Sequence, residues 1–249
     1  MTLMSKTKIT TAVAAVLALV GAASIAQAAV SNGNFATVTG GSPAAAVSTP
    51  QNNPGNAVNV TDWSNGAGDA SGYIFIYSSA NPTATANGVS FYGVTAAPHG
   101  SNFIAVDPVY LNPGELHQLV GGLTIGATYT LTFDWAAAQQ VGYDGPTTEF
   151  WTVDLGSSPS QSTAVYNLPN HGFSGWMGAS FDFVANSTSE VLSFLAGGGP
   201  NAGVPPFDLL ANVALTQKIP EPASIAIFGA GLVGFAGFAA MRRRKNKKS

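Results

Sequence analysis

Three histidines and eleven carboxylates between the two ends of the chain could carry acid–base chemistry or bind a metal. His99, His117 and His171 stand beside turn-forming residues or at a strand start, and their spacing matches no zinc-binding pattern. The sequence has neither a Gly-x-Ser-x-Gly elbow nor a His-Glu-x-x-His pattern. A glycosidase needs paired carboxylates, for which Glu115 and Glu149 are weak candidates that we expect to be solvated. We therefore expect a non-catalytic protein, with a secreted hydrolase acting on polysaccharide as the alternative.

Carbohydrate binding is the chemistry that the aromatic residues favour. Neutral sugars stack their C–H surfaces on aromatic rings, while carboxylates and amides bond to the hydroxyl groups. Trp63 and Trp176 lie beside small or polar residues, so we expect them to be more exposed than the other tryptophans. Tyr143 and Asp144 lie in a loop-like segment. These four residues are the candidate ligand-binding residues, and burial in the core is the competing interpretation of each aromatic.

A structural Ca²⁺ could take oxygen ligands from the first and last strands, and Asn32, Asn34 and Asp208 are the candidates. Turn and capping roles are the competing interpretation of these side chains. We expect no cofactor apart from such a cation. The chain has no cysteine, which excludes disulfides, thiol catalysis and cysteine-ligated zinc.

The basic residues lie near the two ends of the chain, and the region between them is acidic. All nine Lys and Arg residues lie at Lys6, Lys8, Lys218 and in the C-terminal tail, so residues 30–217 carry a formal charge of −11 (0 basic, 11 acidic). Without cations this region cannot neutralise a phosphate backbone, which excludes nucleic acid as a partner. Neutral sugars, divalent cations and basic partners remain. The carboxylates must be solvated, hydrogen-bonded or bound to a cation. They are Asp62, Asp69, Asp107, Glu115, Asp134, Asp144, Glu149, Asp154, Asp182, Glu190 and Asp208.

The elements that position these residues have the two-residue period of β-strands. In 128–135 apolar and polar residues alternate strictly, and 150–155 repeats the pattern. Clusters of Gly, Pro and Asn separate the candidate strands. We therefore predict an all-β fold, a β-sandwich of the jelly-roll type. Further strands are predicted at 73–77, 102–106, 179–184, 191–195 and 212–216.

Four segments resemble secreted jelly-roll domains with a galactose-binding-like fold: 31–35, 100–107, 117–133 and 207–215. The first is similar to an "NGNFE" opening strand, with Ala36 in place of the acid. The last resembles a closing strand with a characteristic Asp. Asp208 and Asn212 are alternative matches to that Asp, which leaves the role of each open.

The N-terminus predicts a signal peptide over 1–28. Two lysines precede an apolar run at 12–23, and Ala26 and Ala28 form the small-x-small cleavage site. The Sec translocon and signal peptidase are the expected partners. The mature chain would begin near Ala29, and an uncleaved N-terminal anchor is the alternative.

The C-terminus carries Pro220, Glu221 and Pro222, then nineteen uncharged residues at 223–241, long enough to cross a bilayer, then a basic tail at 242–249. This arrangement resembles the PEP-CTERM sorting signal of Gram-negative bacteria that make extracellular polysaccharide. The resemblance implies recognition by an exosortase, transient residence in the inner membrane and transfer to the cell surface. An ordinary membrane anchor is the alternative. The membrane-retention residues are Arg242, Arg243, Arg244 and Lys245.

The expected organisation is therefore a signal peptide (1–28), an ectodomain (29–217), a linker with the sorting motif (218–222), a transmembrane helix (223–241) and a cytoplasmic tail (242–249). The leading hypothesis is an exported surface or matrix protein that associates with extracellular polysaccharide or acts structurally in a biofilm or floc. An ice-binding surface protein is a further alternative. Its regular threonine array is not present in the sequence, so we expect thermal hysteresis near zero.

Overall fold

The computed structural model describes residues 30–43, 45–46, 58–65, 74–109, 115–200 and 203–218. The signal peptide, the transmembrane helix, the basic tail and the Pro-Glu-Pro motif lie outside these residues. Within them, no helix is long and apolar enough to cross a membrane.

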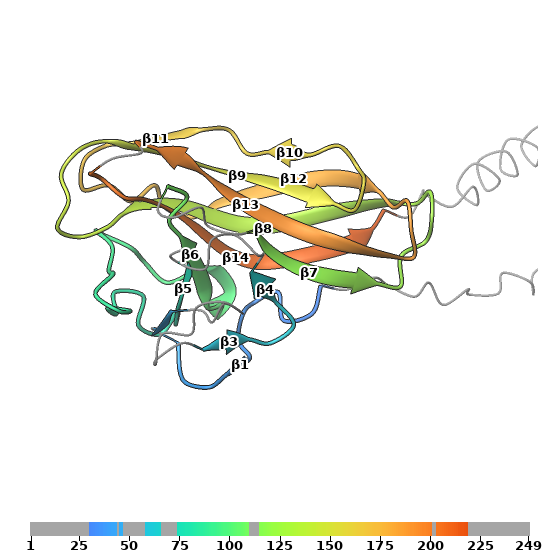
Figure 1. The fold of residues 1–249 in the computed structure, drawn as a ribbon, viewed down its shortest axis with the longest axis horizontal. Coiled ribbons are helices and arrows are strands. Elements are labelled where there is room, and N and C mark those ends of the chain that lie inside the picture. Colours follow the sequence, from blue (N-terminus) through green and yellow to red (C-terminus); the bar gives the residue numbers. More distant parts are fainter. Residues whose placement is uncertain are drawn as a thin grey trace, which may run out of the picture.

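The described residues form strands and one short 3₁₀ turn (Figure 1). The first seven strands are β1 (Val38–Thr39), β2 (Ala45–Ala46), β3 (Asn59–Val60), β4 (Ser64–Asn65), β5 (Ile74–Tyr77), β6 (Phe103–Val106) and β7 (Leu116–Gly121). The others are β8 (Thr128–Gln139), β9 (Thr147–Leu155), β10 (Gln161–Ser162), β11 (Tyr166–Leu168), β12 (Met177–Val184), β13 (Ser189–Gly199) and β14 (Pro206–Gln217). The 3₁₀ turn, η1 (Pro98–Gly100), precedes β6.

Two antiparallel sheets face each other. Sheet I has the order β10-β9-β13-β7-β4 with β11 also on β9, and sheet II has the order β12-β8-β14-β6-β5-β2. The chain crosses between the sheets from β7 to β8, β8 to β9, β11 to β12, β12 to β13 and β13 to β14. The rows β6-β14-β8-β12 and β7-β13-β9-β10 therefore form an eight-stranded jelly roll. The predicted β-sandwich of the jelly-roll type is confirmed.

The main core fills the space between the sheets. In β9 every second residue from Thr147 to Leu155 is buried, and Trp151 is fully buried with Val153 and Leu155 on the same face. The first half of β8 alternates in the same way, with Tyr129, Leu131 and Phe133 inward. This is the alternation that the sequence predicted.

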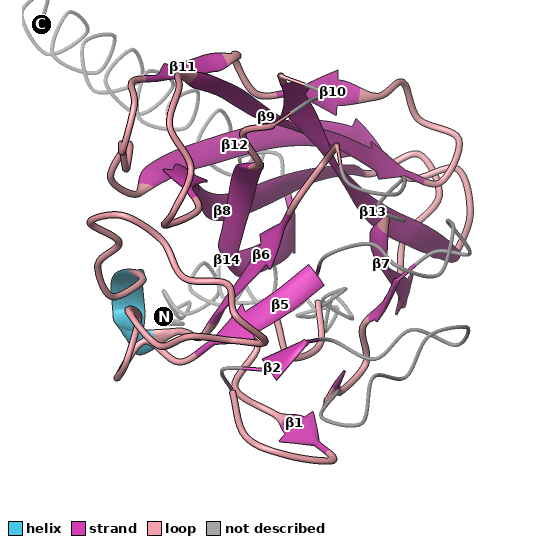
Figure 2. Cartoon of the chain, turned by 60° about the vertical axis from the view of Figure 1, so that its left-hand side comes forward, coloured by secondary structure: helices cyan, strands magenta, loops and turns pink. Residues whose placement is uncertain are grey.

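A second core covers part of the outer face of sheet II. The segment 78–101, which we call the covering segment, crosses β5, β6 and one half of β8 and β14 (Figure 2). Its Phe91 ring packs edge-on against Phe207 at 4.9 Å, and Tyr77 stacks on Phe103 at 5.2 Å. Because both faces of β8 are covered here, residues 136–139 are all buried. The strand consequently extends four residues beyond the predicted 128–135.

The other predicted strands are found with boundary shifts, as β5, β6, β12, β13 and β14. Strands β1 to β4, β10 and β11 were not predicted, and of β7 only the start near His117 was. In β7 the motif Leu-His-Gln-Leu-Val alternates buried and exposed residues, but His117 and Gln118 interrupt the apolar pattern.

Candidate functional site

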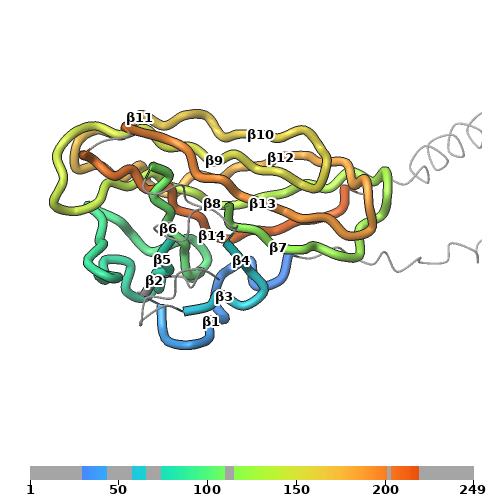
Figure 3. Tube along the Cα trace, viewed as in Figure 1, coloured from blue at the N-terminus to red at the C-terminus, as the bar shows by residue number. Residues whose placement is uncertain are grey.

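An exposed group of aromatic, imidazole, amide and carboxylate side chains lies at one tip of the sandwich, where the loop between β8 and β9 ends the molecule (Figure 3). We call this group the loop cluster. Its members are Tyr92, Tyr143, Asp144, Asn170 and His171. Asp144 and Tyr143 come from the loop after β8, Asn170 and His171 from the loop after β11, and Tyr92 from the covering segment.

The Tyr92 and His171 rings and the Asp144 carboxylate are in direct contact. The His171 ring stacks on Tyr92 with the ring centroids 4.2 Å apart. His171 Nε2 lies 2.7 Å from Asp144 Oδ1, and 82% of the Asp144 side chain is exposed. The Tyr92 hydroxyl accepts a hydrogen bond from the Gly142 amide at 3.2 Å. The three loops are therefore joined by contacts at the protein surface.

A buried glutamine, Gln139, forms hydrogen bonds with the backbone of both loops. Gln139, at the end of β8, is fully buried, and its Nε2 donates to the carbonyl oxygens of Tyr143 at 3.1 Å and Gly145 at 3.0 Å. Its Oε1 accepts the His171 amide. Since every polar atom of the amide side chain is used, Gln139 fixes both loops relative to the sheet.

Two residues of the loops at the loop cluster have a positive φ angle. His171 has φ of 57°, a left-handed conformation that costs energy for a residue with a side chain. Gly145 has φ of 137°, and its amide donates to Asn170 Oδ1 at 2.7 Å. An open hollow of about 750 Å³ begins at Gly145 and runs past Thr148, Asn167 and Pro200. The loop cluster thus stands at the rim of a concave surface.

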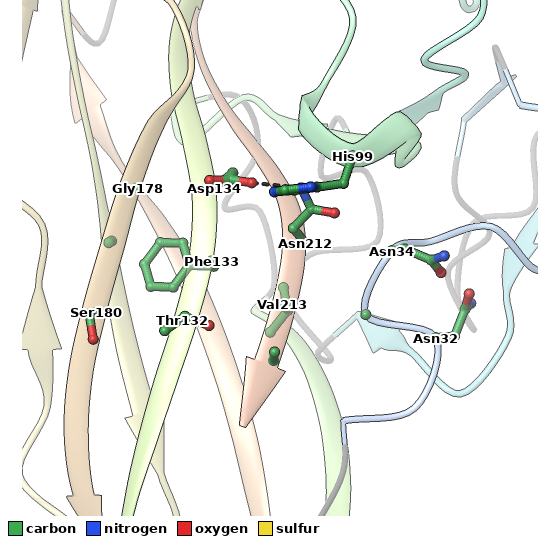
Figure 4. A pocket seen from close by; sticks show the side chains of 13 residues that line it. Asn32, Asn34, His99, Thr132, Phe133, Asp134, Gly178, Ser180, Asn212 and Val213 are labelled. Atoms are coloured by element: carbon green, nitrogen blue, oxygen red, sulfur yellow. Dashed lines mark hydrogen bonds between the residues drawn. The ribbon is translucent and has the colours of Figure 1, made fainter. Parts of the chain in front are cut away.

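A second hollow, which we call the junction pocket, lies on the uncovered half of sheet II (Figure 4). It measures about 690 Å³. Strands β8, β12 and β14 form its floor, with Thr132 and Ser180 exposed there. His99 stands at the end of the covering segment, and Asn32 and Asn34 lie on the N-terminal turn opposite.

The opening and closing motifs meet at the junction pocket. The Val213 amide donates to the Gly33 carbonyl at 2.9 Å, and a Cβ on Gly33 would lie 1.9 Å from the Val213 carbonyl oxygen. Only glycine fits this approach. Asn212 Nδ2 donates to Asp134 Oδ2 at 2.6 Å and to the Pro98 carbonyl at 3.0 Å. Asn212 is therefore the closing-strand residue that lies beside the opening motif.

The predicted calcium ligands are not brought together. Asn32 Nδ2 donates to the carbonyls of Thr37 and Thr61, and Asn34 Oδ1 accepts the Ala36 amide, so both side chains hold turns. Asp208 is fully buried elsewhere, between the sheets. No group of three or more His, Cys, Asp or Glu within the described ranges is arranged to hold a metal. Calcium binding stays a prediction.

The predicted aromatic residues differ from one another in exposure. Trp63 is buried, which is the competing interpretation given for each aromatic residue: only 7% of it is accessible, and its ring packs against Phe35 and Phe194. Its indole N–H donates to the Asn32 carbonyl at 3.1 Å, so the polar edge is satisfied inside. Trp176 is half-buried and donates to the Thr95 carbonyl at 3.2 Å. Tyr143 is 37% exposed, and it lies with Asp144 in the loop cluster.

A buried carboxyl group was missed by sequence reasoning. Glu149 was expected to be solvated, and this was wrong, because it is fully buried beside the equally buried Asp208. Burial raises the pKa of Glu149 to about 8, although the Thr147 hydroxyl opposes the change. Burial, then the charges of Glu149 and Asp107, raise the pKa of Asp208 well above its usual range. Continuing the alternation of 150–155 by one step would have placed Glu149 inside.

The four oxygens of this carboxyl pair have no hydrogen-bond partner within the described part of the chain. The nearby amides of Phe150 and Gly197 oppose the rise in the pKa of Asp208 without preventing it. Burial therefore favours the neutral, protonated form of both groups, because an unpaired charge between the sheets is costly.

The histidines do not form a catalytic unit among the described residues. His117 shares a third hollow, of about 510 Å³, with Ser31 and Asp62. The Ser31 hydroxyl donates to Asp62, and His117 Nδ1 has no hydrogen-bond partner there. No serine–histidine pair poised for nucleophilic attack results. Glu115 is exposed, as expected.

The C-terminal segment matches one known protein-family model. Residues 218–245 match the PEP-CTERM protein-sorting motif, which confirms the predicted sorting signal. The match begins at Lys218, the last described residue, and it indicates export and exosortase-dependent sorting. No curated protein matches the chain.

Solved carbohydrate-binding jelly-roll domains show a weak structural likeness. A CBM4 domain has 18% identity and a TM-score of 0.33, covering 75% of this chain and 98% of that chain. A CBM61 domain in complex with β-1,4-galactotriose has 14% identity and a TM-score of 0.38, covering 64% and 90%. The CBM22-1 xylan-binding domain from Paenibacillus barcinonensis has 11% identity and a TM-score of 0.34, covering 70% and 91%. Likeness at this level carries no argument about ligands.

Proposed function

We propose that this chain is a non-catalytic cell-surface or matrix protein that associates with extracellular polysaccharide through the loop cluster. The sorting-motif match supports export to the surface. The jelly roll, with its tip of exposed aromatic, amide and carboxylate groups, supports the ligand class.

One observation carries the proposal: the buried side chain of Gln139 holds in place the loops that carry the exposed residues of the loop cluster. Surface ion pairs such as His171–Asp144 contribute about 0–1 kcal/mol to stability, so folding does not require them. Nevertheless Gln139 uses its entire amide group to fix the two loops, and His171 takes a strained backbone conformation. Fixed loops lose little entropy on binding, which favours ligand affinity.

The loop cluster has the chemistry that sugar recognition needs. Tyr143 offers an exposed ring for C–H stacking, and Asp144 offers carboxylate oxygens to sugar hydroxyls. Hydrolysis gains no support, since none of the three hollows described above presents two carboxylates. Glu149 and Asp208 are inaccessible to a substrate.

The test is retention of the processed protein on polysaccharide purified from the cells that produce it, measured by affinity electrophoresis. Tyr143→Ala should reduce retention about tenfold, by loss of one stacking contact of about 1.4 kcal/mol. Leu119→Ala is the matched control, because it removes a large side chain that is 69% exposed on another face. Equal retention of both variants would remove the loop cluster from the proposal.

The sorting step is tested separately. Replacing Glu221 in the Pro-Glu-Pro motif with alanine should leave the unprocessed chain in the inner-membrane fraction, while the unaltered protein reaches the surface. Normal processing of the variant would contradict exosortase-dependent sorting through this motif.

A further inference from the structure

Resting on the proposed function, we propose that the loop cluster recognises a glycan with protonated amino groups, a polymer of 2-amino-2-deoxy sugars, in preference to neutral or acidic glycans. The proposal is carried by the position of Asp144 in the loop cluster and by the charge of the surrounding domain.

The domain as a whole disfavours anionic ligands. Residues 30–217 contain no Lys or Arg, and Lys218, the one basic residue after them in the described chain, lies 2.7 Å from Asp182. A uronate, sulfate or phosphate polymer would meet carboxylates without any Lys or Arg side chain to bond it. A polycation is attracted by the same field.

Locally, Asp144 is placed to bind an ammonium group. Its Oδ1 bonds to His171, and the described residues provide no partner for Oδ2, while 82% of the side chain faces solvent. A bond between an ammonium group and a carboxylate is charge-assisted and stronger than a neutral one. His171 holds the carboxylate in one orientation, so the acceptor is fixed before the ligand arrives.

Aromatic rings next to Asp144 distinguish a sugar from a bare cation. Tyr143, its neighbour in sequence, is 37% exposed, and the Tyr92 ring stacks on the histidine that bonds the carboxylate. A pyranose can place its C–H face on a tyrosine ring while its amino group reaches the adjacent acid. A lone metal ion would need more ligands than the single carboxylate and histidine in contact here.

The experiment compares three hexamers that share a β-1,4-linked glucose backbone: glucosamine hexamer, cellohexaose and glucuronic acid hexamer. Calorimetric titration of the processed protein, in mildly acidic buffer that keeps the amino groups charged, should show glucosamine hexamer binding at least tenfold more tightly than the other two. Asp144→Asn should remove this preference. Asp154→Asn, which removes one charge from the outer face of sheet I, should retain it. The melting temperature of each variant checks its fold.

Each other outcome overturns the inference in a distinguishable way. Equal affinity for cellohexaose and glucosamine hexamer contradicts the amino-sugar preference and leaves polysaccharide association standing. Equal losses in Asp144→Asn and Asp154→Asn show general attraction by net charge, with no site at the loop cluster. Hexalysine binding as tightly as glucosamine hexamer, with the same dependence on Asp144, assigns the site to basic peptides. If no hexamer binds while native polysaccharide is still retained, the amino-sugar inference alone is lost.

Discussion

Asp144 and Glu149 are five residues apart and have opposite environments. Asp144 is 82% exposed and bonds to a histidine, whereas Glu149 is fully buried beside another carboxyl group with no base near it. In a domain without Lys or Arg, an acid must remain in solvent, accept hydrogen bonds, bind a cation or lose its charge to a proton. Asp144 illustrates the exposed acid, and Glu149 illustrates the acid whose burial favours protonation.

Because Asp144 is exposed and Glu149 is buried, the two acids have different roles. The exposed acid contributes little to folding and is available to a ligand. The buried pair lies between strand β9 of sheet I and strand β14 of sheet II, so ionisation of either acid would place an unpaired charge between the sheets.

The largest expected effect is a loss of stability as the pH rises from about 4.5 to about 8. Because the folded-state pKa of Glu149 is raised to about 8, the folded protein binds more protons than the unfolded chain above pH 4.5. Stability is therefore fully present below pH 4.5 and falls as the pH rises through 8, by on the order of a few kcal/mol. Thermal denaturation of the processed protein between pH 5 and 9 measures this fall.

Glu149→Gln keeps the shape of the protonated acid without its titration, so it should flatten much of the fall in stability between pH 5 and 8. A Glu149→Gln variant whose stability falls as steeply over this range as that of the unaltered protein would contradict a buried protonated pair.

Asp182 is a useful contrast, since hydrogen bonds from Lys218 and Thr130 lower its pKa. The small contribution of Asp182 to stability is present above the usual pKa of an aspartate and is lost in acid.

Removing Gln139 should affect both regions of the comparison. Gln139→Ala leaves the Tyr143 and Gly145 carbonyls and the His171 amide without their partner, at a cost of roughly 2 kcal/mol. Polysaccharide retention should fall at least tenfold, because the loops are no longer fixed. Urea denaturation and affinity electrophoresis give the two values. A stable variant with full retention would show that Gln139 is not the anchor.

His171→Ala should affect binding more than stability. The substitution removes the stack on Tyr92 and the bond to Asp144, both at the surface. We expect about fivefold weaker retention and less than 1 kcal/mol of destabilisation. Unchanged retention together with a destabilisation well above 1 kcal/mol would show that His171 serves folding and does not serve binding.

The smallest effect is expected for an exposed acid remote from the loop cluster. Asp182→Asn breaks the pair with Lys218, yet it should leave both the urea midpoint of unfolding and the retention on polysaccharide unaltered. Urea denaturation at neutral pH measures the midpoint. A clear shift of the midpoint would mean that exposed carboxylates contribute more to stability than this comparison allows.

Sequence reasoning could predict the strands because alternation along a half-buried sheet is a local property. It could not predict the covering segment, since the four buried residues at 136–139 have no alternation. The burial of Trp63 could not be decided for a similar reason: its small polar neighbours describe a turn, while its ring enters the core.

Only some residues of the loop cluster could be predicted from the sequence. Tyr143 and Asp144 follow each other in a loop and could be recognised as exposed. Tyr92, Gln139 and His171 come from three separate segments, and only the fold brings them together. No local pattern identifies the partners of His171, which are 27 (Asp144) and 79 (Tyr92) positions away along the chain.

Strand β8 connects the end of the domain where the sorting motif begins with the loop cluster at the other end. At its first residue, Thr128, the carbonyl accepts the amide of Lys218, where the sorting motif begins, and at its last residue, Gln139, it supports the tip. Twelve extended residues span roughly 36 Å. A chain tethered by its C-terminal end would therefore aim its tyrosines and Asp144 at the surroundings, so that capture of a polymer need not wait for release from the lipid.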